Sequence, residues 1–521
     1  MDKNLRHQIG QMIIAGFPSL EVDEQACRLV EEYQVGNFIL FARNMQNARQ
    51  TAAMCGALSR MAFDKLGVAP FIAADQEGGM VSRITEGAAL FPGAMAMAAG
   101  ATEAQARQVG KNCGEMLRAL GVNVNFAPVL DVNIEPMNPI IGTRSYGDDP
   151  QKVADLGCAV MEGMVEGGVI ATLKHYPGHG NVNTDSHLAL PVNHTDPAVL
   201  EKTEFLPFKQ AFDRGAPALM SCHIVFPKID PELPATLSPA IVGDLLRNKQ
   251  GFDGLVFTDC MEMDAIRANW GTAKGAVLAV AAGCDVLCIS HHIEAVQGAI
   301  EAIEQAVADG TIPRSRIQQS YDRIMAAKKR MGLLEAQQVS ADAADAILHD
   351  AEKLALHWKI SRDCVALMED KGGLAALAQA KKPLILAPVF QTSTGVEDKE
   401  HDGRTFARIA GQKLGWDFVE FPMTPDEEAR AGAVEAAKQA DALVLGLYNC
   451  RFRETQQALL AQLEALGKPL TVVLLGAPYD AAHVRNADAL LCSFEYTPLS
   501  TLTMAEALAE GTYRGKMPVK L

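Results

Sequence analysis

The chain has 521 residues, of which 49% are hydrophobic and 21% charged. This apolar fraction excludes disorder for the bulk of the chain and is sufficient for large buried cores. The chain has 63 acidic and 47 basic residues, so the net charge is −16. An acidic surface repels the phosphate backbone, so we expect no nucleic-acid partner.

The sequence also shows no membrane or export signal. The longest apolar runs, such as residues 276–282, are far shorter than the roughly 18 residues that a membrane span needs, so we expect no membrane partner. No apolar stretch follows the first charged residues, so we expect no signal peptide. The eleven cysteines are dispersed and lack C-x-x-C spacing. They resemble reduced thiols rather than a disulfide framework, which predicts a cytoplasmic protein.

In the N-terminal two-thirds of the chain, short apolar runs alternate with longer amphipathic stretches. The predicted strands are residues 35–41, 70–75, 122–129, 169–174, 218–223, 254–259 and 284–289. Such alternation is typical of a parallel sheet covered by helices. Seven or eight strand–helix units within about 330 residues predict a TIM-like (β/α)8 barrel, which we assign to residues 1–335.

A second α/β unit follows a predicted closing helix over residues 317–334. We interpret residues 336–350 as a linker, and residues 351–521 as a smaller C-terminal α/β sandwich domain. Its predicted strands are residues 365–368, 383–387, 418–421, 442–447, 470–475 and 489–492.

Polar or ionisable residues end most of the N-terminal strands. They are Arg43–Asn44, Asp75–Glu77, Asp131, Lys174–His175, His223, Asp259 and Ser290–His292. Active sites of parallel barrels are built at the C-terminal ends of the strands. We therefore expect these side chains to meet at the mouth of the barrel.

The stretch from Lys174 to His187 is the richest in chemistry. Pro177, Gly178 and Gly180 break regular structure, so we expect a loop over the barrel mouth. Asp185 precedes His187 by two residues, and a carboxylate can orient an imidazole and stabilise its charged form.

Metal binding is the alternative for this loop, because His175, His179, Asp185 and His187 are zinc-ligand types. The helical H-E-x-x-H spacing is lacking, however, and Lys174 would repel a cation. We therefore expect no metal.

Two further groups complete the predicted site. Asp259 ends an apolar strand, where a carboxylate can act as a nucleophile or stabilise charge. Glu262 and Asp264, which follow it, are interpreted as acids at a helix N-terminus. Asp75 can accept hydrogen bonds from sugar hydroxyls, and Arg83 and Arg144 are forked donors.

There is no glycine-rich phosphate motif and no Walker lysine, so group transfer on a polyhydroxylated substrate fits better than hydride transfer, and no cofactor is expected.

At these residues the chain resembles family 3 glycoside hydrolases, specifically their β-N-acetylglucosaminidase branch. The motifs are Lys174–Gly180 followed by Asp185-Ser186-His187, Asp75–Gly79, Arg144–Gly147, and Thr258-Asp259-x-Met261-x-Met263. The resemblance covers residues 1 to about 335 well. The C-terminal part is similar to the family's second α/β domain, but it is shorter and its motifs are weaker.

The resemblance implies a role for each matching position. Asp259 would be the nucleophile, His187 the general acid/base, and Asp185 its partner. The sugar-binding residues would be Asp75, Arg83, Arg144, Lys174 and His175. A retaining mechanism without metal or cofactor follows.

Members that act on glucosides place a glutamate acid/base outside this loop, often in the second domain. The Asp185–His187 pair therefore favours N-acetylglucosamine over glucose, and we expect the C-terminal domain to support the barrel or shape an outer subsite. A glycoside phosphorylase, a β-glucosidase and a catalytically silent sugar-binding protein are the alternatives. A histidine acid/base is compatible with incoming phosphate. The group to which the sugar is attached and the oligomeric state are left open.

Overall fold

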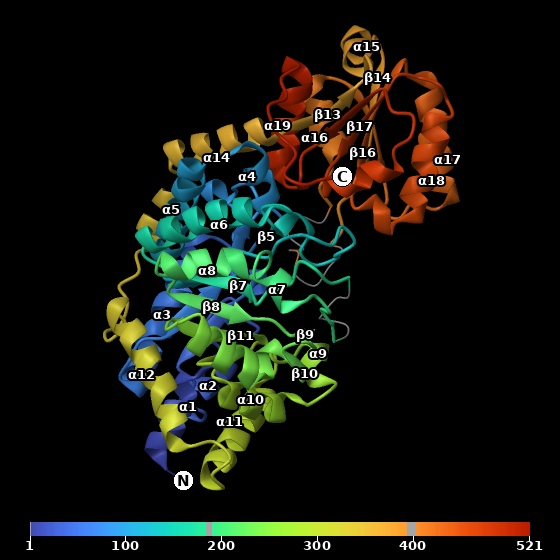
Figure 1. The fold of residues 1–521 in the computed structure, drawn as a ribbon. Coiled ribbons are helices and arrows are strands. Elements are labelled where there is room, and N and C mark those ends of the chain that lie inside the picture. Colours follow the sequence, from blue (N-terminus) through green and yellow to red (C-terminus); the bar gives the residue numbers. More distant parts are fainter. Residues whose placement is uncertain (1, 184–189, 393–396, 398–402) are drawn as a thin grey trace.

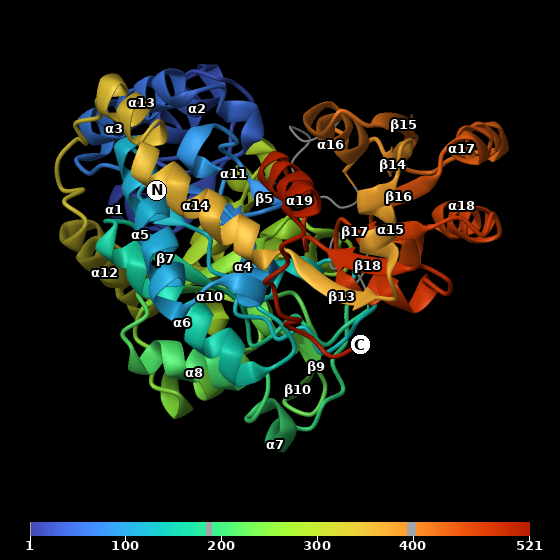
Figure 2. The ribbon, with the colours of Figure 1, turned by 90° about the horizontal axis from the view of Figure 1, so that it is seen from above.

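The computed structural model describes residues 2–183, 190–392, 397 and 403–521. Figure 1 shows two parts, a barrel built by the N-terminal two-thirds of the chain and a separate sheet domain built by the rest. Seen from above in Figure 2, the sheet domain lies beside the barrel, and helices α14 (Ala351–Cys364) and α19 (Pro498–Glu510) lie between them.

The barrel is closed by eight parallel strands, which confirms the predicted (β/α)8 fold. They pair in the order β1-β12-β11-β8-β7-β6-β3-β2. Their bounds are β1 (Ile13–Ala15), β2 (Asn37–Leu40), β3 (Phe71–Ala74), β6 (Val124–Asn125), β7 (Ile170–Tyr176), β8 (Ala218–Ser221), β11 (Leu255–Cys260) and β12 (Val286–Ile289). Two short antiparallel hairpins, β4 (Gln76–Gly78) with β5 (Val81–Ser82) and β9 (Val225–Phe226) with β10 (Asp230–Pro234), follow strands β3 and β8.

The sequence patterns did not predict strand β1, and they predicted a longer strand than β6. Strand β1 has three residues directly behind a helix, which is too short for a recognisable pattern. Strand β6 has two residues instead of the eight predicted. Pro128, which has no N–H to donate, follows shortly after it. The chain beyond β6 still forms single hydrogen bonds to its neighbours, such as Phe126 N–H to Ala74 O, and an isolated bridge pairs Val129 with Lys174.

Helices surround the barrel (Figures 1 and 2). They include α1 (Lys3–Gln11), α2 (Glu24–Glu31), α3 (Ala48–Leu66), α5 (Glu103–Ala119), α6 (Pro150–Glu166), α8 (Phe205–Asp213), α10 (Thr272–Ala282), α11 (Ile293–Ala308) and α12 (Arg314–Arg330). Their ends follow local sequence rules. Asn47 caps α3, Thr102 and Gln105 form a capping box on α5, and Asp149 precedes Pro150 at the start of α6.

The C-terminal part is the predicted α/β domain, with all six predicted strands present. They are β13 (Ala366–Asp370), β14 (Pro383–Pro388), β15 (Asp417–Phe421), β16 (Ala442–Leu447), β17 (Leu470–Leu474) and β18 (Ala489–Cys492), in the order β13-β18-β17-β16-β14-β15. Only β13 runs antiparallel to its neighbour. Helices α15 (Gly373–Gln379), α16 (Phe406–Leu414), α17 (Glu427–Gln439), α18 (Glu454–Glu464) and α19 cover the sheet.

The segment expected to be a linker contains helix α13 (Ala341–Leu348), which packs against α3 and α5 of the barrel. Arg49 of α3 forms an ion pair with Asp342, at 2.6 Å between Nη1 and Oδ1. Helix α14 then packs against both α4 (Ala94–Gly100) and α19. The division at residues 335 and 351 remains a prediction.

A buried carboxylate joins the two parts. Glu495 follows β18, and its Oε2 accepts a hydrogen bond from the backbone N–H of Gly93, in the barrel part, at 2.7 Å. The same oxygen lies so close to Gly79 that a Cβ atom there would stand 2.8 Å from it. Burial raises the pKa of Glu495 to about 7. The sheet domain therefore fixes the turn between β4 and β5.

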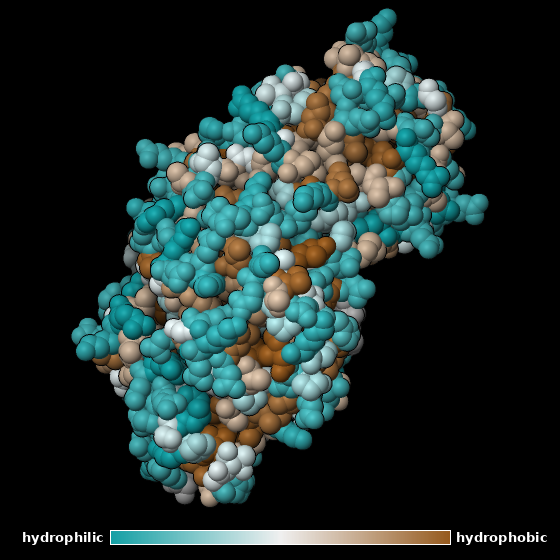
Figure 3. All heavy atoms as spheres, in the orientation of Figure 1, coloured by the Kyte–Doolittle hydropathy of each residue, from teal (hydrophilic) through white to brown (hydrophobic). Residues whose placement is uncertain are grey.

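Within the described residues, no helix has both the length and the apolarity needed to cross a membrane. Figure 3 shows one face of the molecule, where hydrophilic residues cover most of the surface and hydrophobic ones gather in patches between them.

Candidate active site

A cavity of about 980 Å³ opens where the barrel strands end. Six of the eight predicted site residues line it, namely Asp75, Arg83, Arg144, Lys174, His175 and Asp259. The other two, Asp185 and His187, lie outside the described residues. The expectation that polar strand ends converge at the barrel mouth is met for Asp75, Lys174, His175 and Asp259, whereas Asp131 and His223 are not among the lining residues.

Asp75 and Lys174 form the centre of the predicted sugar-binding set. Lys174 Nζ donates to Asp75 Oδ1 at 2.7 Å, and Arg83 Nη2 lies 3.4 Å from Asp75 Oδ2. Burial alone would raise the pKa of Asp75, but Lys174 and Arg83 outweigh it and hold that pKa below its ordinary value. Asp75 is therefore an ionised acceptor flanked by two cationic donors.

Glu77 lines the cavity too, although the sequence motif indicated no role for it. Its carboxylate receives a forked hydrogen bond from Arg144, at 2.9 Å from Nε and 2.8 Å from Nη2. Lys174 Nζ lies 2.6 Å from Glu77 Oε1. The signal was the spacing of two residues from Asp75, which places both carboxylates on one side of an extended chain.

Asp131, at the end of another predicted strand, holds the segment after β7. It is fully buried and accepts from His175 Nδ1 at 2.6 Å and from the backbone N–H of His179 at 2.6 Å. Burial would raise the pKa of Asp131, but these donors, with His175 foremost, hold it below its ordinary value. The ionised carboxylate thereby sets which ring nitrogen of His175 carries a proton.

His179 lies beside His175, with ring centroids 5.6 Å apart at an interplanar angle of 65°. Burial, together with the neighbouring His175, lowers the pKa of His179 to about 4. His179 is therefore neutral at physiological pH. His175 and His179 are two of the four residues considered as zinc ligands in the sequence. The other two, Asp185 and His187, lie outside the described residues.

The loop towards Asp185 starts from a tightly packed backbone. A Cβ atom on Gly180 would lie 1.8 Å from the carbonyl oxygen of Val132, so this position must be glycine. One residue later, Asn181 Nδ2 donates to Thr195 Oγ1 at 3.0 Å. The two sides of the loop are thus joined at its base.

Asp259 lies at the end of β11 and lines the cavity. Its Oδ1 accepts the backbone N–H of Cys260 at 2.7 Å. His223 Nε2 donates to the carbonyl oxygen of Cys260 at 3.0 Å, because a carbonyl can only accept. The backbone directly after Asp259 is therefore held by hydrogen bonds on both of its polar groups.

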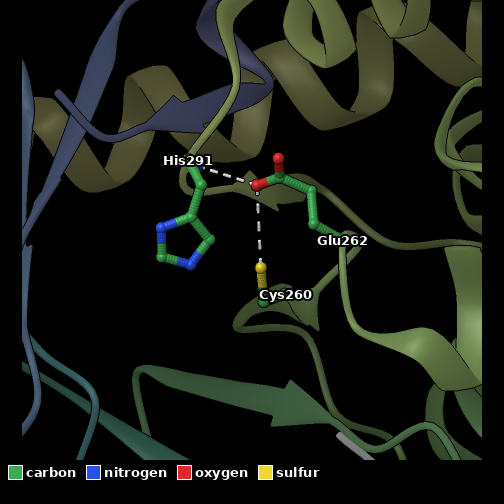
Figure 4. A group of neighbouring side chains, drawn as sticks. All are labelled: Cys260, Glu262 and His291. Atoms are coloured by element: carbon green, nitrogen blue, oxygen red, sulfur yellow. Dashed lines mark hydrogen bonds between the residues drawn. The ribbon is translucent and has the colours of Figure 1, made fainter. Parts of the chain in front are cut away.

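Glu262 is not a helix N-terminal acid, as the sequence suggested. Helix α9 (Asp264–Arg267) begins two residues later, and Asp264 occupies its first turn as expected. Glu262 instead accepts backbone N–H bonds from Ser290 at 2.6 Å, His291 at 2.8 Å and His292 at 3.1 Å. Figure 4 shows the bond from His291. Glu262 fixes the loop after β12 against the end of β11, a pairing across 28 residues that no local pattern reveals.

The sheet domain also reaches the cavity. Glu397 is among the lining residues, and Tyr448 donates its hydroxyl hydrogen to Glu397 Oε1 at 2.5 Å. Tyr448 follows strand β16, so the sheet positions this contact.

Residues 4–327 match the Glycosyl hydrolase family 3 N terminal domain. The chain belongs to glycosyl hydrolase family 3. It is 35% identical over 290 residues to a beta-hexosaminidase from Alkalilimnicola ehrlichii, which covers 54% of this chain and 82% of that protein. It is 36% identical over 277 residues to Beta-hexosaminidase A from Pseudoalteromonas piscicida, covering 50% of this chain and 46% of that protein. The match thus spans less than half of the latter's length.

A solved structure extends the likeness to the whole chain. It is a family 3 beta-N-acetylglucosaminidase from Paenibacillus sp. str. FPU-7, with a TM-score of 0.94, 35% identity, and 99% of each chain covered. Together the relatives confirm the predicted family, the two-part fold and a glycoside hydrolase of the β-N-acetylhexosaminidase branch.

Proposed function

We propose that this family 3 member is a retaining exo-β-N-acetylglucosaminidase that works through a covalent glycosyl–Asp259 intermediate. The observation that carries the proposal is the presence of Asp259 in one cavity with Asp75, Lys174 and His175. A carboxylate at a strand end thus shares its cavity with an array of groups suited to sugar hydroxyls.

The proposed sugar-binding residues differ in what they offer. The ionised Asp75 accepts hydrogen bonds from hydroxyl groups, and Lys174 and Arg83 beside it donate them. Arg144 is held by Glu77 and lines the same cavity. His175, oriented by Asp131, contributes the ring nitrogen that does not face that carboxylate.

In the first step, a carboxylate oxygen of Asp259 attacks the anomeric carbon, and the bond from that carbon to the leaving oxygen breaks. The imidazolium of His187 gives its proton to this oxygen. In the second step, His187 takes a proton from water, and the resulting nucleophile releases the sugar from Asp259 with the β configuration retained. Asp185 orients the His187 ring. These two roles rest on the sequence motif.

The proposed substrate is a terminal β-linked N-acetylglucosamine on peptidoglycan (muropeptide) or chitooligosaccharide fragments. The barrel of residues 1–335 would carry the chemistry, and residues 351–521 would shape the far side of the cavity through Glu397. We further propose a cytoplasmic location. It is supported by the eleven cysteines, all in the described part of the chain, none of which is in a disulfide.

The experiment that tests this function compares aryl β-N-acetylglucosaminide with aryl β-glucoside, each with and without phosphate. We expect hydrolysis of the N-acetylglucosaminide at a rate that phosphate does not change, with the β-anomer as the first product by NMR. A sugar 1-phosphate product would indicate a phosphorylase. Faster cleavage of the glucoside would indicate a β-glucosidase.

A further inference from the structure

A thiol, a carboxylate and an imidazole meet at the rim of the cavity, outside the proposed sugar-binding set. They belong to Cys260, Glu262 and His291, and their potential ligand atoms all lie within 4.8 Å of one another. Cys260 Sγ lies 3.9 Å from Glu262 Oε2. Figure 4 shows the thiol facing the carboxylate, with the His291 ring beside them. Two strand-end segments, after β11 and after β12, supply the three groups.

The Glu262 carboxylate, the His291 ring and the backbone of Cys260 are each held before any ligand binds. The Glu262 carboxylate is fixed by three backbone N–H groups after β12: Oε2 accepts from Ser290 and His291, and Oε1 accepts from His292, whose Nδ1 lies 2.6 Å from the same Oε1. The His291 ring stacks on Phe41, with centroids 5.3 Å apart. The backbone of Cys260 is held through both its N–H and its carbonyl. Little side-chain entropy remains to be lost on binding.

The donor set selects a class of cation. A thiolate sulfur with an imidazole nitrogen suits zinc, whereas calcium and magnesium require oxygen ligands. Glu262 adds a carboxylate that is oriented by further hydrogen bonds, as in protein zinc sites. With three protein ligands, a fourth position stays open for water. Arg43 lies over the Phe41 ring at 4.3 Å and Arg83 at 5.9 Å, so two cations are nearby, and the carboxylates of Glu262 and Asp259 line the same cavity.

We propose that Cys260, Glu262 and His291 form a zinc site that inhibits the enzyme. Binding replaces the proton of the Cys260 thiol with a sulfur–zinc bond and releases that proton to solvent. All three ligands line the active-site cavity, and Cys260 directly follows Asp259. The bound ion occupies space beside Asp259 and places positive charge next to the carboxylate that must attack the sugar. Inhibition rests on the proposed function, whereas zinc binding does not.

Zinc binding is measured on the full-length protein by competition with a chromophoric chelator. We expect one zinc per chain, and an affinity at least tenfold weaker in Cys260→Ser and in His291→Ala. Cobalt gives a second readout, because a thiolate ligand produces a near-ultraviolet charge-transfer band that Cys260→Ser should remove.

Two controls match these variants. Cys27→Ser changes another half-buried cysteine, and His349→Ala changes another exposed histidine, which lies beside the half-buried Glu86 and Asp345. Both should bind zinc as the wild type does. Equal zinc affinity in Cys260→Ser, His291→Ala and the wild type overturns the site, as does a cobalt complex without the thiolate band.

Inhibition is measured as the zinc concentration that halves the rate, compared within each protein with its own zinc-free rate. We expect this concentration to rise at least tenfold in Cys260→Ser, and a strong chelator to restore the zinc-treated wild type fully. Zinc binding without inhibition overturns the inhibitory role. If the protein cleaves neither aryl glycoside, the proposed function fails, while the binding data still decide the metal site.

Discussion

The Nδ1 atom of His175 lies 2.6 Å from Oδ2 of Asp131, and both side chains are buried. The same carboxylate accepts the backbone N–H groups of His175 and His179. One ionised group thus fixes a predicted sugar-binding ring and the start of the loop that leads to Asp185 and His187.

Asp131→Asn should therefore impair both folding and turnover. An amide has one acceptor oxygen and places an NH2 group against donors, so we expect a loss of about 2–3 kcal/mol in the free energy of unfolding. The rate constant kcat/KM should also fall at least tenfold because His175 is no longer oriented. Denaturant unfolding and steady-state kinetics measure the two effects. Asp213→Asn, at an exposed position, is the control. A variant that matches the wild type in both respects would contradict the role of Asp131.

Asp259→Ala should abolish turnover, because the proposed nucleophile is removed. A 2-deoxy-2-fluoro or 5-fluoro sugar inactivator should label Asp259 in the wild type, as peptide mass spectrometry would show. Loss of activity in the variant together with a label on a different residue would move the nucleophile elsewhere.

His187→Ala should slow substrates with poor leaving groups far more than activated aryl glycosides, since only the former need a proton on the leaving oxygen. The ordinary pKa of histidine, about 6.5, suits a group that is acid and base in turn. Asp185→Ala should lower the rate less than Asp259→Ala, because the imidazole survives without its orienting partner. The measurement is kcat/KM across a series of leaving groups. Equal losses for good and poor leaving groups would show that the acid lies elsewhere.

Glu397→Gln should change the turnover of aryl N-acetylglucosaminide only a few-fold, although Glu397 lines the cavity. The proposed acid/base belongs to the barrel, so the sheet domain loses only an outer contact, and KM for chitooligosaccharides should rise more than KM for the aryl glycoside. Glu454→Gln, in the first turn of α18, is the matched control. A collapse of the rate comparable to that of Asp259→Ala would place the acid/base in the sheet domain and favour the β-glucosidase alternative.

Glu495 should make the fold less stable at alkaline pH. Its pKa rises from 4.5 to about 7 on burial, so its contribution to stability is fully present below pH 4.5 and is lost as pH rises through 7. At about 1.4 kcal/mol per pKa unit, the ionised form costs on the order of 3 kcal/mol at pH 8. Glu495→Gln mimics the protonated acid and should raise Tm at pH 8 but not at pH 4.5. Parallel Tm curves for the two proteins would exclude this titration.

The sequence predicted the barrel because most of its strands are continuous apolar runs that end in polar residues, as β7 and β11 do. It could not reveal β1, whose three residues are too few for a pattern. Local signals also led to the correct expectation that Asp75, Lys174 and Asp259 meet in one cavity.

The pairings that organise the site were harder to predict because they join residues far apart in the chain. Arg144 binds Glu77 across 67 residues, and Asp131 binds His175 across 44. Glu262 was misinterpreted because a carboxylate near a helix start has a local explanation, while its real partners follow the next strand. Only the folded barrel brings those partners together.

The contact of Glu495 with Gly79 and Gly93 bears on how such proteins can be recombined. A Cβ atom at Gly79 would lie 2.8 Å from the carboxylate of the other part of the chain, which is a collision, and one at Gly93 would lie 3.1 Å from it, which is a tight contact. A chimaera that grafts the sheet domain of a relative onto this barrel must therefore bring a residue that leaves the same space, or the turn carrying Glu77 will shift. The two parts can therefore be exchanged between relatives only when the residue at position 495 of one part is compatible with positions 79 and 93 of the other.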